Sequence, residues 1–127
     1  MEIKENLYYS QNHEWVRLKG DKAYIGITDY AQEQLGDIVF IELPETGDQF
    51  SSGEEIGVIE SVKAVSEIYT PVSGEILETN TKLLDDPELL NQKPYESWII
   101  TLELEDESEL DQLLSAIDYE SYCEGEE

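Results

Sequence analysis

Short stretches of alternating apolar and polar residues, separated by turns, fill the chain up to Glu105. Residues 15–18 and 23–27 alternate in this way around a glycine-containing loop, and this pattern predicts a β-hairpin. The strongest strand pattern covers residues 37–43, where apolar side chains fall on both faces. We therefore expect both faces of that strand to be covered by other parts of the protein.

Four more strands are predicted farther along the chain. Residues 55–61 and 64–70 form strand patterns on either side of a tight turn at Val62-Lys63. Strand patterns follow at residues 75–79 and 97–104, and the second of these alternates from Trp98 onward. Residues 45–55 include two glycines and two serines, so we expect this segment to be mostly loop.

Helical signals are few and short. Thr28 is a candidate N-cap for a helix over residues 29–35, and the glycine that follows this segment would end the helix. Asp86-Pro87 predicts a single helical turn, because proline is favoured at the first helical position. Ser108 is expected to cap a helix near the end of the chain. The apolar residues of that helix recur at helical spacing: Leu110, Leu113, Leu114 and Ile117.

These elements predict an all-β fold with small α content, a sandwich or barrel of short strands with a C-terminal helical appendage. A length of 127 residues suits one domain, 1–127. Its core is expected at about 7–104 and its C-terminal helices at about 108–123. The acidic tail, 124–127, is expected to be solvated.

Charge narrows the possible partners. The chain has 31 Asp and Glu residues against 7 Lys and Arg, a formal net charge of −24. Such a surface repels phosphate backbones and anionic lipids, so neither nucleic-acid nor membrane binding is expected. Basic protein surfaces are the expected partners. The start of the chain resembles no targeting segment, and the single cysteine, Cys123, cannot form an internal disulfide, so a cytoplasmic location is expected.

Catalytic constellations are missing from the sequence. His13 is the only histidine, and the chain contains no Gly-x-Ser-x-Gly motif that would supply it with a nucleophile. Cys123 lies in an acidic stretch that blunts the reactivity of a thiol. Pairs of carboxylates occur, but so many acids produce pairs by composition alone. We therefore expect no enzyme activity and no metal site.

Lys63 is the most informative basic residue. It occupies a predicted tight turn between two strands, where glycine, asparagine or aspartate would be usual. A long amine presented to solvent on a stiff support suits a lysine that another enzyme modifies with an activated acyl donor. The residues alone leave an ordinary surface lysine equally open.

Glu60-Ser61-Val62-Lys63-Ala64 closely resembles the lipoylation motif of the glycine cleavage system H proteins. A biotin carrier, the nearest competing family, brackets its lysine with methionines, whereas Met1 is the only methionine here. The resemblance extends over nearly the whole chain in the family's order. Further segments that carry it include His13-Glu14-Trp15-Val16, Leu35-Gly36-Asp37-Ile38-Val39, Pro71-Val72-Ser73-Gly74-Glu75 and Leu113-Leu114-Ser115-Ala116.

The resemblance implies a flattened β-sandwich, the barrel-sandwich hybrid of lipoyl and biotinyl domains. It also implies lipoate in amide linkage on Lys63 and no catalysis by the chain itself. The carrier would take an aminomethyl group from glycine decarboxylase, a pyridoxal-phosphate enzyme, to a tetrahydrofolate-dependent aminomethyltransferase. Dihydrolipoamide dehydrogenase, which uses FAD and NAD, would then reoxidise the dithiol. Enzymes that attach lipoate are further implied partners.

The resemblance also points to a cleft that shelters the loaded arm. Glu14 is the main candidate to bind its amine, since a carboxylate suits an ammonium group, with His13 as a neighbour and Glu67 as a weaker candidate. Glu14 could instead pair with Arg17 or face solvent. Glu60 and Ser61 are expected to serve recognition by the lipoylating enzymes.

Two other functions remain open at this point. Some bacterial members of the family relay octanoyl or lipoyl groups to other carriers, and that role would use the same Lys63. A chain that is never modified would instead be an acidic interaction module.

Overall fold

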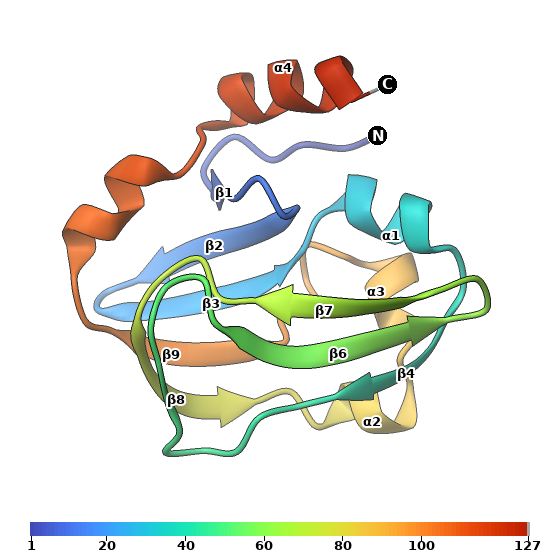
Figure 1. Ribbon diagram of the computed structural model, residues 1–127, viewed down its shortest axis with the longest axis horizontal. Coiled ribbons are helices and arrows are strands. Elements are labelled where there is room, and N and C mark those ends of the chain that lie inside the picture. The colour runs from blue at the N-terminus through green and yellow to red at the C-terminus, as the bar shows by residue number, and fades with distance from the viewer. Residues whose placement is uncertain (127) are drawn as a thin grey trace.

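The computed structural model describes residues 1–126 and consists of two β-sheets with short helices around them (Figure 1). The larger sheet has six strands in the order β1-β2-β3-β9-β8-β5, and the smaller has three in the order β4-β6-β7. The smaller sheet lies in front of the larger one in the view of Figure 1. The strands are β1 (Tyr8–Tyr9), β2 (Glu14–Lys19), β3 (Lys22–Ile27), β4 (Ile38–Glu42), β5 (Gln49–Phe50), β6 (Glu55–Ser61), β7 (Val65–Tyr69), β8 (Gly74–Thr79) and β9 (Ile100–Leu104).

The helices lie around the sheets and at the end of the chain. They are α1 (Asp29–Leu35), α2 (Lys82–Asp85), α3 (Leu89–Gln92), the 3₁₀ helix η1 (Glu107–Gln112) and α4 (Ala116–Glu126). The mostly β class with a C-terminal helical appendage is therefore confirmed. The short β5 and α2 were not predicted from the sequence, because two to four residues carry too little periodicity to stand out.

The local signals around α1 are confirmed. The side chain of Thr28 accepts a hydrogen bond from the backbone N–H of Ala31, which is the geometry of an N-cap. Gly36 ends the helix with a φ of 75°, a conformation that favours glycine. The hairpins β2–β3 and β6–β7 are also confirmed, each with antiparallel pairing.

The expectation that both faces of β4 are covered is wrong. The side chains of Val39 and Phe40 are 53% and 46% exposed, whereas Ile38 and Ile41 are buried. The strand lies at an edge of the smaller sheet, and its register with β6 shifts between Ile38 and Phe40. This bulge adds a residue and changes the direction of the following side chains. The smaller sheet therefore exposes apolar groups on one face.

The single helix expected from Ser108 onward is also wrong. Asp106 caps η1 by accepting hydrogen bonds from the backbone N–H and hydroxyl of Ser108. After η1 the chain is extended, and Leu114 exchanges two backbone hydrogen bonds with Tyr9 of β1. The helical spacing of leucines misled the prediction because this β-bridge interrupts it. α4 then begins, and it continues to Glu126 through the expected acidic tail.

Two groups of buried side chains hold these elements together. The first lies between the sheets and is aliphatic, with Ile25, Ile59 and Ile76 among its fully buried members. The second is aromatic and lies where α4 covers β1 and β2. In it the rings of Tyr9 and Tyr119 stack at 4.5 Å between centroids. The helical appendage is therefore packed on the sheet by a distinct aromatic cluster.

Gly57→Ala tests how closely β6 approaches β4. A Cβ atom at Gly57 would lie 2.4 Å from the backbone carbonyl oxygen of Glu42, which cannot move without shifting the strand. We expect a loss of about 1–3 kcal/mol in the free energy of unfolding, measured by urea denaturation. Gly125→Ala is the control, because a Cβ there would meet nothing within 4 Å. Equal stability of the two variants would contradict the expectation.

Candidate functional site

Lys63 stands in the tight turn between β6 and β7, as the strand pattern predicted. The turn is closed by a hydrogen bond from the backbone N–H of Ser61 to the carbonyl oxygen of Ala64 at 2.8 Å. The hydroxyl oxygen of Ser61 accepts from the N–H groups of Lys63 and Ala64 at 3.2 and 3.0 Å. The N–H of Val62 donates to the carbonyl oxygen of Asp37 and fixes the turn to the chain before β4. The support of the lysine is therefore rigid.

The Lys63 side chain is exposed and passes over the end of α1. Its Cε atom lies 2.9 Å, and its Nζ atom 3.7 Å, from the position that a Cβ atom on Gly36 would occupy. The glycine that ends α1 thus also leaves room for the lysine side chain. Figure 1 shows the tip of the β6–β7 hairpin beside the segment that leaves α1.

A cleft of about 180 Å³ lies next to this end of α1. Its walls come from the start of β2, from α1, and from β6 and β7, so both sheets contribute to it. The lining residues include His13, Glu14, Tyr30, Ala31, Gln34, Leu35, Ile59, Ser66, Glu67 and Ile68. The three cleft candidates from the sequence, His13, Glu14 and Glu67, are therefore brought together. The motif residues Glu60, Ser61, Val62 and Ala64 lie at the hairpin tip and do not line this cleft.

Glu14 is buried where the two sheets meet. One of its carboxylate oxygens accepts a hydrogen bond from the Ser10 hydroxyl at 2.7 Å, and the other accepts from the backbone N–H of Tyr69 at 3.1 Å. Neither an ion pair with Arg17 nor exposure to solvent is found for this group. The guanidinium of Arg17 donates instead to the carbonyl oxygen of Tyr95 at 3.0 Å.

Burial raises the pKa of the Glu14 carboxyl to about 7, although the hydrogen bonds from Ser10 and Tyr69 lower it. The buried position disfavours the charged carboxylate, and only two neutral donors compensate for the lost water. A cation that entered the cleft would stabilise the charged form. Near neutral pH this carboxyl can therefore gain or lose a proton, or pair with an ammonium group.

His13 is held in place by aromatic neighbours from distant parts of the chain. Its backbone has a φ of 66°, the only positive value among non-glycine residues of the described chain. The imidazole stacks on Tyr30 of α1 at 4.5 Å, and its Nδ1 lies 2.7 Å from the hydroxyl of Tyr119 in α4. That hydroxyl also lies 2.7 Å from the Thr28 hydroxyl. Tyr119 thus connects α4 to the N-cap of the helix that forms one wall of the cleft.

Glu67 has a different environment from Glu14. Its side chain is exposed, and its carboxylate accepts a hydrogen bond from the hydroxyl of Tyr69 at 2.8 Å. It therefore lies at the rim of the cleft, in contact with water. The two acids differ in what they offer to a ligand, because only the Glu14 carboxyl is already desolvated.

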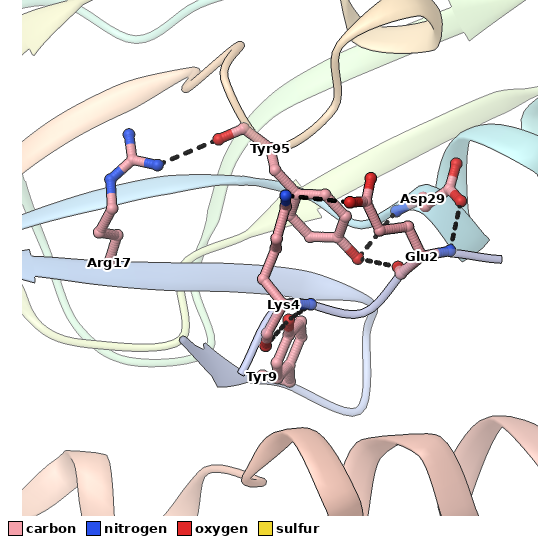
Figure 2. A network of polar contacts seen from close by, with 6 residues as sticks. All are labelled: Glu2, Lys4, Tyr9, Arg17, Asp29 and Tyr95. Carbon is pink, nitrogen blue, oxygen red and sulfur yellow. Dashed lines mark hydrogen bonds and ion pairs between the residues drawn. The ribbon is translucent and has the colours of Figure 1, made fainter. Parts of the chain in front are cut away.

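A segment near the N-terminus contacts the first residue of α1 (Figure 2). The backbone N–H of Glu2 donates to the Asp29 carboxylate at 2.6 Å, and the Tyr95 hydroxyl donates to the carbonyl oxygen of Glu2. The Tyr9 hydroxyl also binds this segment, because it accepts a hydrogen bond from the backbone N–H of Lys4 and donates one to the carbonyl oxygen of Lys4. These contacts therefore restrain the start of the helix that lines the cleft.

Sequence reasoning missed Ser10, Tyr30 and Tyr119. The bond between His13 and Tyr119 spans 106 positions, so no local pattern could indicate it. Ser10 lies only four residues before Glu14, but serine at that distance is common in turns and carries no specific signal.

Comparisons with known proteins agree with this fold. The family model of the glycine cleavage H-protein matches residues 7–126. A glycine cleavage system H protein from Thermoanaerobacter sp. (strain X514) is 56% identical over 126 residues, which cover 99% of this chain and 100% of that protein. One from Halothermothrix orenii is 54% identical over 98% of both chains. The crystal structure of a glycine cleavage system H protein from Mycobacterium marinum superposes with a TM-score of 0.85 at 35% identity, covering 96% of this chain and 99% of that one.

The two-sheet fold and the family match define a carrier protein, which presents a group to other proteins and has no catalytic role itself. The chain belongs to the glycine cleavage H-protein family. It is a lipoyl carrier of the glycine cleavage system, whose other components are its partners, and the family carries lipoate. Within residues 1–126, no helix has the length and apolar character needed to cross a membrane.

Glu14→Gln tests the burial of the carboxyl through the pH dependence of stability. Because the folded-state pKa is raised, the stabilising contribution of Glu14 is full below about pH 4.5 and is lost as the pH rises through about 7. Between pH 4.5 and pH 8, the free energy of unfolding of the wild-type protein should therefore fall by about 3 kcal/mol relative to that of the Glu14→Gln variant. Urea denaturation of both proteins at several pH values measures the difference.

Glu67→Gln is the matched control, because the carboxylate of Glu67 is exposed. Its stability relative to the wild type should stay nearly constant across the same pH range. A constant difference for Glu14→Gln as well would show that the Glu14 carboxyl is not desolvated.

Proposed function

We propose that Lys63 carries lipoate in amide linkage on its Nζ atom. The observation that carries this proposal is an exposed lysine at the tip of a rigid hairpin, with its side chain over the end of the helix that lines the cleft. Glu60, Ser61, Val62 and Ala64 surround the lysine and form the motif that the attaching enzymes would read. Lipoate supplies a dithiol that can be reduced, loaded and reoxidised. The protein positions the arm that bears this dithiol.

We further propose that the cleft shelters the arm when it carries the aminomethyl group. From Gly36, where the lysine side chain lies, the cleft-lining residues Leu35, Gln34 and Ala31 lead back along α1. An arm folded along this path would place its end near Glu14. Apolar walls exclude water from the loaded group, and the single buried carboxyl can pair with its ammonium.

The cleft must protect the cargo without binding it permanently. A carboxyl whose pKa is raised to about 7 meets both conditions, because it is only partly ionised near neutral pH and a cation in the cleft shifts it toward the charged form. His13 and Tyr30 form the adjoining part of the wall, and Glu67 lies at the rim. We assign them to the shape of the entrance rather than to binding of the amine.

In this proposal the chain works as one carrier domain in the cytoplasm. It receives the aminomethyl group at glycine decarboxylase, delivers it to the aminomethyltransferase, and presents the dithiol to dihydrolipoamide dehydrogenase. Cys123 is the only cysteine, and it is buried on α4, so it does not compete with the dithiol of the arm.

Lys63→Ala tests the attachment site. After incubation of the apo protein with a lipoate–protein ligase, lipoate and ATP, the wild type should gain the mass of one lipoyl group and the variant none. Lys19→Ala is the control, because Lys19 is another exposed lysine at a hairpin turn, between β2 and β3. Intact-mass spectrometry measures the mass of the wild type and of both variants. Addition of lipoate to the Lys63→Ala protein would refute the assignment.

Glu14→Gln tests protection of the cargo. The variant should be lipoylated normally, because Glu14 lies in the cleft and not at the hairpin tip. Once loaded, it should lose the aminomethyl group to water, as formaldehyde and ammonia with the thiol restored, about tenfold faster, since the amide cannot pair with the ammonium as a carboxylate does. The rate is measured from the formaldehyde that is freed. A rate equal to that of Glu67→Gln and of the wild type would remove Glu14 from the proposal.

A further inference from the structure

The outer face of the smaller sheet carries apolar and acidic side chains in a regular alternation. Two rows of residues cross the three strands in register, with each row taking one position from β4, β6 and β7. In the first row two apolar side chains flank an acid, and in the second row two acids flank an apolar side chain. The first row is Phe40, Glu60 and Val65, and the second is Glu42, Val58 and Glu67. We call these six residues the outer face.

Apolar groups on the outer face are open to water. Phe40 and Val65 are 46% and 67% exposed, and next to them Val39 and Val62 are 53% and 67% exposed. These four are half of the eight large hydrophobic residues that are exposed in the described chain. They come together within one hairpin and the strand beside it. Clustered exposure of this kind marks a surface that another molecule covers.

The charge of this region is one-sided. Residues 36–70, which contain the whole smaller sheet, hold eight acids and a single basic residue, Lys63. The ion pairs Lys4–Glu2 and Lys93–Glu96 lie elsewhere in the described part of the chain. The acids of the outer face therefore remain available to cations from outside. A complementary surface must bring arginine or lysine side chains and place apolar groups between them.

We propose that the outer face is the docking surface for the enzyme that acylates Lys63. The inference rests on the proposed attachment of lipoate to that lysine. This enzyme meets the chain while the lysine is bare, so it must recognise the protein rather than the arm. The outer face is continuous with its target, since Glu60 precedes Lys63 by three residues and Val65 follows it by two.

The alternation of acidic and apolar residues on the outer face indicates which side chains the enzyme must present to it. Arginine guanidinium groups can pair with the acids and lie over the ring of Phe40 at the same time. Apolar side chains of the enzyme would cover Val58 and Val65 between those pairs. Charged contacts of this kind speed the encounter, and the apolar centre slows dissociation.

Phe40→Ser is the decisive variant, because Phe40 lies on β4, outside the hairpin that bears Lys63. With a lipoate–protein ligase, lipoate and ATP, we expect its KM for the apo protein to rise about tenfold with kcat nearly unchanged. Ile117→Ser is the matched control, since Ile117 is 80% exposed on α4. That variant should have the KM of the wild type. Thermal denaturation confirms that both variants are folded.

The dependence of the KM on ionic strength and on the acids of the outer face provides a second test. The KM of the wild type should rise with ionic strength, because the expected contacts are between exposed charges. Glu42→Gln should raise the KM at low salt and reduce its salt dependence. Glu75→Gln on β8, which removes an exposed acid of the other sheet, should change neither.

The outcomes separate this inference from the proposed function. If the wild type gains no lipoyl group, the attachment proposal fails. If the wild type is lipoylated and Phe40→Ser matches Ile117→Ser in KM, only the docking surface is refuted. The KM of the Phe40→Ser variant can also be measured with dihydrolipoamide dehydrogenase. A rise in that KM, with no rise in the KM for the ligase, would refute the assignment of the acylating enzyme to this face.

Discussion

The buried carboxyl of Glu14 is the point at which the two sheets and the cleft meet. It belongs to β2 of the larger sheet, and it accepts a hydrogen bond from the backbone of Tyr69 in the smaller one. Removing it from water costs free energy, which is why its pKa rises to about 7. The protein bears this cost at neutral pH. Such a cost is typical of a group kept for binding rather than for folding.

Other parts of the structure hold this carboxyl and its surroundings in position. Ser10 donates to it from the turn before β2, while His13 in the same turn is fixed by Tyr30 and Tyr119. The left-handed backbone of His13 is strained for a residue with a Cβ atom. Aromatic packing under α4 compensates for that strain. The C-terminal helix, which looks like an appendage in Figure 1, therefore contributes to the shape of the cleft.

The fold could be predicted wherever its signals are local, and the site only in part. Thr28 and Gly36 mark the two ends of α1 because caps depend on a few neighbouring residues. The turn at Lys63 follows from two flanking strand patterns. The contact between His13 and Tyr119 and the exposure of Phe40 depend instead on tertiary neighbours. Alternation places Phe40 on one face of β4, but only the three-stranded sheet and its bulge decide that this face meets solvent.

The alternation of side chains along the β6–β7 hairpin separates two tasks. Ile59, Ser66 and Ile68 point toward the core and line the cleft, whereas Glu60 and Val65 lie on the opposite face. The lysine at the tip belongs to neither face, so its side chain can reach the cleft or a partner without any movement of the strands. A change at Phe40 or Val65 can therefore alter recognition without altering the cleft proposed to shelter the arm, whereas Glu67 belongs both to the outer face and to the rim of the cleft. A carrier that must visit several proteins and still protect its cargo needs this independence, and a hairpin with a lysine at its tip provides it through backbone geometry alone.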